Sequence, residues 1–376
     1  MDSSYLIVAL DFIAAFLLGG AMIKLLLRIA YHNRLFDQPG VRKVHTIPVP
    51  RLGGMSFLPT IVIVIAFTIG SLYRFDLVSV SFTDNVLFVR VAYLMGAAMV
   101  LYVVGVADDL SDIGYKTKFA FQFLSALILV FSGLWIRNLY GLFGVHAVPD
   151  WIGIPLTLLL LVFVMNALNL IDGIDGLASG LAIISLACLS AIFIYERRFV
   201  YAMTSLSTLG VVSAFWLFNV FGKPEKEMKL YMGDTGSLTL GLILCFLILS
   251  LGTFTGHNGP TRNCKYFIIA FSSLMIPMLD VARLVIFRIK HHRNPFKPDM
   301  NHIHHKLIQL GCTPRKALGI LLGADAVLIL LNAFFSMYVN VNILLAVDII
   351  IYYCLIRFLT ERILKKGLGQ HPVQVQ

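Results

Sequence analysis

The chain has 376 residues, of which 59% are hydrophobic and only 13% are charged. A soluble globular domain has about half hydrophobic and about one quarter charged residues, so this composition excludes a soluble protein and indicates an integral membrane protein. The formal net charge is +10. Because no basic stretch is long or interleaved with aromatic residues, we expect no nucleic-acid partner, and the positive charge is explained by anionic inner-leaflet lipids.

Apolar runs long enough to cross a membrane recur along the whole sequence. A spanning helix needs roughly 17 to 25 residues, and lipid forces each crossing segment to be helical because it offers no partner to backbone polar groups. We find about eleven such runs, near residues 5–27, 54–72, 87–107, 119–136, 151–169, 177–195, 200–218, 237–254, 265–283, 316–338 and 341–360. The sequence therefore predicts one all-α, polytopic membrane domain over residues 1–376.

Lys and Arg residues predict the orientation, because they are retained on the cytoplasmic side. Most of the 30 Lys and Arg residues fall in alternate gaps between the runs. These gaps cover residues 28–53, 108–118, 170–176, 219–236 and 284–315, together with the tail from 361. Nearly every acid-rich or histidine-rich motif lies in the same gaps. We therefore expect one polar, cytoplasmic face that handles a charged substrate.

The first gap holds Lys43 and His45, followed by two prolines and the pair Gly53 and Gly54. Prolines stiffen a loop, so Lys43 and His45 are candidates for presentation to an anionic substrate. An ordinary basic cytoplasmic loop explains the charges almost as well, but it does not explain the prolines and glycines that follow them.

Asp108 and Asp109 end the third run, and Lys118 follows in the same gap. Adjacent carboxylates repel, which raises the pKa of one of them unless a cation compensates. A solvated helix end is the alternative. The nearby lysine favours a site for phosphate groups, where cations stand beside metal-binding or basic carboxylates.

Four polar residues at three-residue spacing mark the end of the fifth run, namely Asn166, Asn169, Asp172 and Asp175. This spacing keeps successive members on one helix face. Ionisable groups at membrane depth are functional-site candidates by default. Hydrogen bonding between helices by the Asn side chains is the alternative, and the spacing does not match a calcium-binding EF-hand loop.

The segment Gly233-Asp234-Thr235-Gly236-Ser237 opens the eighth run. Its glycines expose backbone N–H groups at a helix N-terminus, which favours an anion. An acid at such a place makes sense mainly when it holds a divalent cation that also binds phosphate oxygens. Asp234 is therefore the main candidate metal ligand, and a role in capping the helix is compatible with it.

The last gap combines Asp299 with His302, His304 and His305. Imidazole donors suit the recognition of a nucleotide phosphate. Zinc is the alternative, but zinc sites use wider spacings with an outer carboxylate, and the five cysteines form no CxxC pair.

In order and spacing, these motifs resemble those of the polyprenyl-phosphate N-acetylhexosamine-1-phosphate transferases (glycosyltransferase family 4), integral membrane enzymes that include the one making lipid I for peptidoglycan. The final loop, Pro-Asp-x-x-His-Ile-His-His, is similar to that of the branch that uses UDP-GlcNAc and unlike the His-His-His of the muramoyl-pentapeptide branch. The resemblance implies transfer of GlcNAc-1-phosphate from UDP-GlcNAc to undecaprenyl phosphate with release of UMP. It also implies a bacterial cytoplasmic (inner) membrane and the first membrane step of a polysaccharide such as O-antigen or teichoic acid.

The resemblance further implies roles for the residues in these motifs. The cofactor would be Mg²⁺, with Mn²⁺ as a substitute, held by Asp234 with Asn169 or Asp172. The candidate catalytic residues are Asp108, Asp109, Asp172 and Asp175, and the candidate substrate-binding residues are Lys43, His45, Lys118, Asn166, Asn169, Asp299, His302, His304 and His305. Because a phosphate monoester with a second pKa of about 6 is mostly dianionic at pH 7, a direct in-line attack needs little general-base help.

A transporter or lipid flippase is the alternative from another functional class. It predicts polar residues near helix midpoints and in both membrane halves. Asp11, Asp325 and Asp348 do lie within apolar runs, but the other motifs gather at one end. The sequence leaves open the exact UDP-N-acetylhexosamine, the polysaccharide, a covalent intermediate and the oligomeric state, although homodimers are common in the family.

Overall fold

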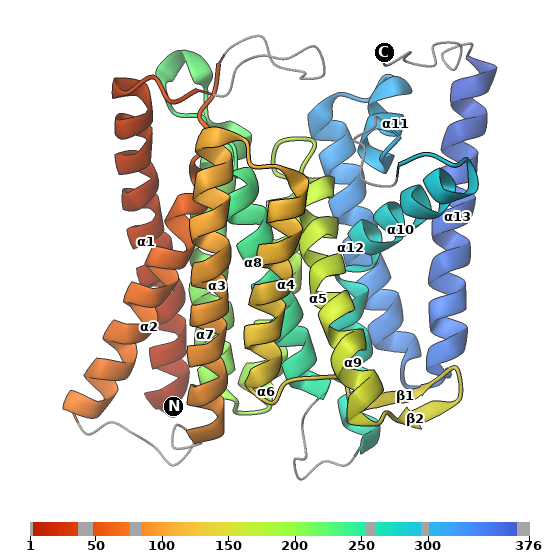
Figure 1. The fold of residues 1–376 in the computed structure, drawn as a ribbon, viewed down its shortest axis with the longest axis horizontal. Helices are drawn as coiled ribbons and strands as arrows, with labels where there is room; N and C mark the ends of the chain where they lie inside the picture. The colour runs from red at the N-terminus through yellow and green to blue at the C-terminus, as the bar shows by residue number, and fades with distance from the viewer. Residues whose placement is uncertain (1–2, 37–47, 76–84, 253–259, 295–300, 367–376) are drawn as a thin grey trace.

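The computed structural model describes residues 3–36, 48–75, 85–252, 260–294 and 301–366. Nearly all of this part is helical (Figure 1). The helices are α1 Ser3–His32, α2 Phe57–Arg74, α3 Asn85–Ser111, α4 Tyr115–Phe131, α5 Asp150–Ile171, α6 Leu177–Tyr195, α7 Phe199–Phe221, α8 Gly233–Gly252, α9 Pro260–Ser272, α10 Met275–Lys290, α11 Ile303–Gln309, α12 Pro314–Phe335 and α13 Val341–Lys365. Short 3₁₀ turns at Gly53–Ser56 (η1) and Pro224–Lys226 (η3) precede α2 and α8.

Nine helices of the described part are long and apolar enough to cross a membrane, and these are α1, α2, α3, α5, α6, α7, α8, α12 and α13. The helix pair α9 and α10 passes the same test when taken together. The shorter α4 packs between α3 and α5. The structure thus confirms the prediction of an all-α, polytopic membrane protein. The expected number of about eleven spans was too high for the described residues, which contain nine, or ten if α9 and α10 form one span, because α4 has only 17 residues.

The predicted run at 265–283 is not a single straight helix. α9 ends at Ser272, α10 begins at Met275, and the two axes are bent by 67°. Backbone N–H groups of Ser273 and Leu274 donate to carbonyls three residues back, which closes a tight turn at the break. Pro277 lies in the first turn of α10, where its missing N–H leaves no helical hydrogen bond unmade. The bend carries α10 across to α5 and α13.

A short antiparallel hairpin, β1 Asn138–Leu142 and β2 Val145–Ala147, connects α4 to α5 and was not expected from the sequence. It lies at the end of the helical bundle that also holds the start of α1 (Figure 1). Asn342, at the start of α13, fixes its turn by donating to the Gly141 carbonyl (2.8 Å) and accepting from the Phe143 N–H (2.6 Å).

α8 forms the centre of the bundle. Its residues are almost all buried, as expected for a helix that is apolar on every side, and it packs against α3, α5, α6 and α9. Small residues allow the close approach. A Cβ on Gly105 of α3 would lie 2.4 Å from the Thr235 Cα, and one on Gly241 would lie 2.7 Å from the Met165 Cα of α5. This packing places the first turn of α8 between the ends of α3 and α5.

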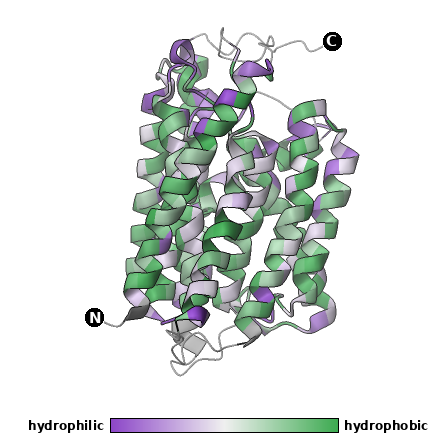
Figure 2. Ribbon diagram, turned by 90° about the vertical axis from the view of Figure 1, so that its left-hand side faces the viewer, coloured by the Kyte–Doolittle hydropathy of each residue, from purple (hydrophilic) through white to green (hydrophobic). Residues whose placement is uncertain are grey.

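The gaps predicted to share one face do so. The end of α3, the end of α5, the start of α8 and α11 all lie at one end of the bundle, opposite the β-hairpin (Figure 1). Hydrophilic residues gather mainly at the two ends, and the helix sides between them are mostly hydrophobic (Figure 2). The polar motifs are therefore at a membrane–water boundary.

Candidate active site

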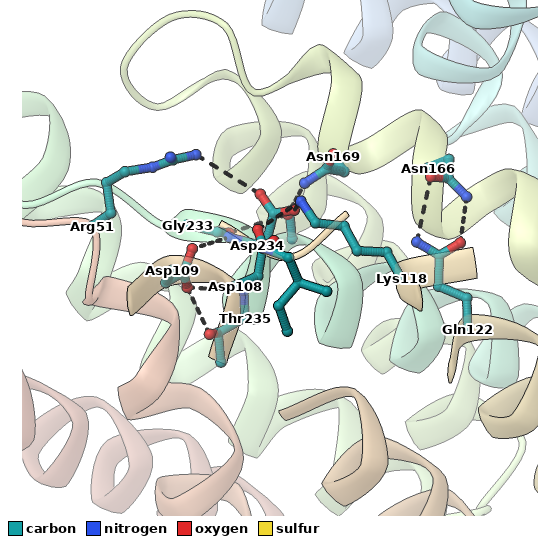
Figure 3. Close-up of polar contacts among 12 residues, drawn as sticks. Arg51, Asp108, Asp109, Lys118, Gln122, Asn166, Asn169, Gly233, Asp234 and Thr235 are labelled. Carbon is teal, nitrogen blue, oxygen red and sulfur yellow. Dashed lines mark hydrogen bonds and ion pairs between the residues drawn. The ribbon is translucent and has the colours of Figure 1, made fainter. Parts of the chain in front are cut away.

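Three carboxylates meet where the end of α3 approaches the start of α8. Asp108, Asp109 and Asp234 each offer an oxygen within 4.8 Å of the others, the only such His/Cys/Asp/Glu cluster among the described residues. Asp109 caps α8, because its Oδ1 accepts from the Asp234 N–H (2.8 Å) and its Oδ2 from the Thr235 N–H (3.1 Å) and hydroxyl (2.6 Å) (Figure 3). The sequence assigned the helix cap to Asp234, but the N-terminus of α8 is capped by Asp109 of the neighbouring α3.

Gly233 is required for this arrangement. Its φ of 74° is in the left-handed region, and a Cβ there would lie 2.5 and 2.6 Å from the two Asp109 carboxylate oxygens. Any side chain at this position would therefore strain the backbone and displace the cap.

Two basic side chains offset the charge of the carboxylates. Lys118 of α4 bridges two of them, with its Nζ 2.6 Å from Asp108 Oδ2 and 2.7 Å from Asp234 Oδ2. Arg51 approaches the other oxygen of Asp234 at 3.8 Å. Figure 3 shows Arg51 and Lys118 reaching Asp234 from different elements. The Lys118 ammonium thus bridges Asp108 and Asp234, which indicates that these two carboxylates favour a positive charge between them.

The four polar residues at the end of α5 have different surroundings. Asn169 lies beside Asp234 and donates to the Ser237 hydroxyl (2.8 Å). Asn166, one turn deeper in the membrane, instead pairs with Gln122 of α4, to which it donates at 2.7 Å (Figure 3). Both Asn side chains therefore make the interhelical hydrogen bonds weighed for them, but only Asn169 lies beside the carboxylate cluster.

Asp172 follows the last residue of α5 and lies in the electrostatic field of the cluster. Burial raises the pKa of its carboxyl to about 7, assisted by repulsion from Asp175, Asp234 and Asp109, and Arg51 acts in the opposite direction. Asp175 is paired with Lys229, which precedes α8. The Asp172 carboxyl therefore changes protonation state near neutral pH, whereas the Asp175 carboxylate is paired with the Lys229 ammonium.

α7 holds the loop that carries these two acids. Asn219 accepts from the Gly176 N–H (2.6 Å) and donates to the Leu230 carbonyl (2.9 Å), so it joins the loop after α5 to the segment before α8. Trp216 donates to the Gly176 carbonyl (3.2 Å). Sequence reasoning missed Asn219, Trp216, Lys229 and Gln122, because their importance comes only from contacts with distant segments.

The segment that carries His302, His304 and His305, here called the histidine loop, packs on the loop that follows α5. His304 is fully buried, and its ring packs so tightly on Gly173 that a Cβ there would lie 2.1 Å from Nε2. Burial, with the neighbouring His305 and His302, lowers the pKa of His304 to about 3, so its imidazole is neutral. Neither ring nitrogen has a hydrogen-bond partner among the described residues. The rings of His302 and His305 lie 5.6 and 4.2 Å from that of His304.

Of the residues that the sequence singled out, the structure brings many together around the start of α8. They are Asp108, Asp109, Lys118, Asn169, Asp172, Asp175 and Asp234. His304 packs on Gly173, next to Asp172, and the rings of His302 and His305 lie beside that of His304. Asn166 is engaged elsewhere. Lys43, His45 and Asp299 lie outside the described residues.

Comparison with known proteins agrees with this geometry. Residues 91–252, from α3 to the end of α8, match the model of glycosyl transferase family 4. The chain is 29% identical over 321 residues to a probable undecaprenyl-phosphate N-acetylglucosaminyl 1-phosphate transferase of Bacillus subtilis, covering 84% of this chain and 81% of the relative. It is 28% identical over 325 residues to the undecaprenyl-phosphate alpha-N-acetylglucosaminyl 1-phosphate transferase of Escherichia coli strain K12, covering 86% and 82%. The corresponding Yersinia pestis protein is 26% identical over 355 residues, covering 92% and 91%.

The apolar helices indicate a multi-pass membrane protein, and the similarities indicate a glycosyltransferase. Residues 91–252 are similar to glycosyl transferase family 4, and most of the chain is similar to undecaprenyl-phosphate N-acetylglucosaminyl 1-phosphate transferases.

Proposed function

We propose that the protein transfers GlcNAc-1-phosphate from UDP-GlcNAc to undecaprenyl phosphate, giving undecaprenyl-diphosphate-GlcNAc and UMP. The observation that carries this proposal is the cluster of Asp108, Asp109 and Asp234, with Lys118 and Arg51, at the membrane boundary of a chain whose relatives bear that activity in their names. A lipid acceptor has to stay in the bilayer while a nucleotide donor arrives from water. A polar site at the end of a helical bundle is accessible to both.

The donor set of this cluster suits Mg²⁺, which takes carboxylate and phosphate oxygens in place of part of its water shell. Asp108 and Asp234 would hold the ion, because their Oδ2 atoms already share one cation, and Asn169 would complete the site beside Asp234. Asp109 supports them from the α8 cap. When bound, Mg²⁺ would neutralise phosphate charge as a Lewis acid, and Mn²⁺ offers the same chemistry.

The chain's own residues then act on two anions that repel each other. An oxygen of the lipid phosphate attacks the phosphorus attached to GlcNAc, and the bond from that phosphorus to the bridging oxygen breaks, so that UMP leaves with the bond electrons. Lys118 and Arg51 offset the charge as the phosphates approach. The acceptor phosphate is mostly dianionic at pH 7, its second pKa being about 6, so the attack needs little help from Asp108 as a general base.

His302, His304 and His305 would contact the donor, because the histidine loop packs on the loop that carries Asp172. The end of the bundle that holds the site would face the cytoplasm of a bacterium, since basic residues gather in the loops at that end and nucleotide sugars are made in the cytosol. Polysaccharide synthesis at the cell envelope is the pathway in which such a lipid-linked sugar is used.

The test is direct transfer by purified protein in detergent or nanodiscs, given undecaprenyl phosphate, Mg²⁺ and radiolabelled UDP-GlcNAc. We expect UMP and a lipid-linked GlcNAc in equal amounts, and loss of both products on chelation of the ion. Parallel reactions with UDP-GalNAc and other UDP-N-acetylhexosamines define the donor. If a known transferase forms product under these conditions and this protein does not with any donor, the proposal is wrong and a carrier function gains support.

A further inference from the structure

Behind the histidine loop lies a second buried cluster, centred on Asp280 of α10. The Asp280 side chain is fully buried and accepts four hydrogen bonds. Its Oδ2 pairs with His302 Nδ1 at 2.7 Å. Its Oδ1 accepts from the Tyr352 hydroxyl (2.7 Å), the Ile303 N–H (3.1 Å) and Arg283 Nη2 (3.1 Å).

These bonds fix both the ring and the backbone of His302. His302 is the N-cap residue of α11, with an extended conformation at φ −61° and ψ 154°. The Ile303 N–H, in the first turn of α11, binds the same carboxylate as the His302 ring. Arg283 also donates to the carbonyl of Asn301, the residue before His302 (2.6 Å). Asp280 therefore sets where α11 begins, and with it the position of the following histidines.

The pairing also determines which nitrogen of His302 can bind a ligand. An Nδ1–H donated to a carboxylate leaves Nε2 as the ring atom for another partner, and the orientation of the ring is held by that bond. The charged and titratable groups that the described structure places around His302 are Asp280 and Arg283 of α10, Tyr352 of α13, and His304 and His305 of α11. Among them, Asp280 is the one carboxylate.

Tyr352 connects this cluster to the far end of the sequence. It lies 72 residues after Asp280, on α13, which packs against both α10 and α11. The residue is 8% exposed, whereas the next residue, Tyr353, is 59% exposed. The Tyr352 hydroxyl reaches the histidine loop through Asp280, so its effect on that loop is indirect.

We propose that Asp280 and Tyr352 are positioning residues that hold His302 in the geometry needed to bind the nucleotide diphosphate of the donor. This inference rests on the proposed function, because the donor is the ligand that the histidine loop would contact. It adds α10 and α13, which lie beyond the residues 91–252 that match the family, to the structure that determines donor binding. We expect binding of the acceptor lipid and the geometry of the carboxylate cluster to be independent of Asp280 and Tyr352.

The test compares Tyr352→Phe and Asp280→Asn with the wild type, and Tyr353→Phe is the matched control on the exposed face of the same helix. We expect the KM for UDP-GlcNAc to rise about tenfold in Tyr352→Phe, because the loss of one hydrogen bond to a charged group corresponds to about a tenfold change in affinity. The rise should be larger in Asp280→Asn, where the charge itself is lost. The kcat and the KM for undecaprenyl phosphate should stay within about twofold. Tyr353→Phe should match the wild type throughout.

A second measurement separates this inference from the proposed function. Reaction of the histidines with diethyl pyrocarbonate, followed by mass spectrometry, gives the reactivity of His302 with and without UDP. We expect UDP to protect His302 in the wild type and in Tyr353→Phe, and to protect it less in Tyr352→Phe. If the wild type forms UMP but Tyr352→Phe changes kcat and both KM values in parallel, or only lowers the melting temperature, the positioning role is wrong. If the wild type forms no UMP and UDP gives no protection, the proposed function fails first.

Discussion

The contact between Gly173 and His304 makes one part of the site depend on the absence of a side chain in another. A Cβ at position 173 would lie 2.1 Å from His304 Nε2, 2.6 Å from Cε1 and 3.0 Å from Cδ2. Comfortable contacts between such atoms begin at about 3.5 Å, so Gly173→Ala forces the ring or the loop to move by about 1.4 Å.

The surroundings of His304 leave little room for that movement. The ring is fully buried, and α11 is held at its start by the bonds to Asp280. A shift of about 1 Å in a group that positions substrate can lower the rate about 100-fold. We therefore expect kcat/KM for UDP-GlcNAc to fall about 100-fold in Gly173→Ala. Overpacking of this size should lower the free energy of unfolding by about 1–3 kcal/mol.

The assay is UMP release by the purified variant, with Gly319→Ala as the control. Gly319 is an exposed residue of α12 where an added Cβ meets nothing within 4 Å, so this variant should keep wild-type activity. In a His304→Ala background the clash is absent, and Gly173→Ala should then reduce activity by less than about twofold. A full additional loss in the double variant, or an unchanged rate in Gly173→Ala, would refute the reasoning.

Three further predictions concern neighbouring groups. Gly233→Ala should lower the free energy of unfolding by about 1–3 kcal/mol in thermal melts, because φ is positive and Asp109 occupies the space; an unchanged melt contradicts the cap geometry. Lys118→Met should tighten Mn²⁺ binding, measured by electron paramagnetic resonance, because the ammonium no longer competes for Asp108 and Asp234, while transfer falls at least about tenfold; weaker binding would show that the lysine and the ion do not share a site. Since burial lowers the pKa of His304 to about 3 from 6.5, the folded chain binds fewer protons than the unfolded chain and loses stability as pH falls below 6.5. Melting temperatures at about pH 7 and pH 5 should therefore differ more for the wild type than for His304→Asn, and equal differences would exclude the effect.

The sequence predicted much of the candidate site because its motifs are local. Asp108 and Asp109 are adjacent, Asn169 and Asp172 are three residues apart, and Asp234 opens a run, so each signal lies within a few residues. The predicted helix face was wrong for Asp172 and Asp175, because α5 ends at Ile171. The partners of these groups were less predictable. Gln122 binds Asn166 across 44 residues and Lys229 binds Asp175 across 54, and nothing in the local pattern distinguishes them from other polar residues.

Hydropathy and charge alone predicted that this chain is a bundle of membrane helices with its polar motifs at one end, because lipid dictates helix length and basic residues mark alternate loops. Only the tertiary structure decided that Asp109 caps α8, that the run at 265–283 bends by 67°, and that Tyr352 reaches the histidine loop through Asp280. These features depend on how closely helices approach, which small residues such as Gly105 and Gly241 permit. Periodicity within one segment carries no information about that distance.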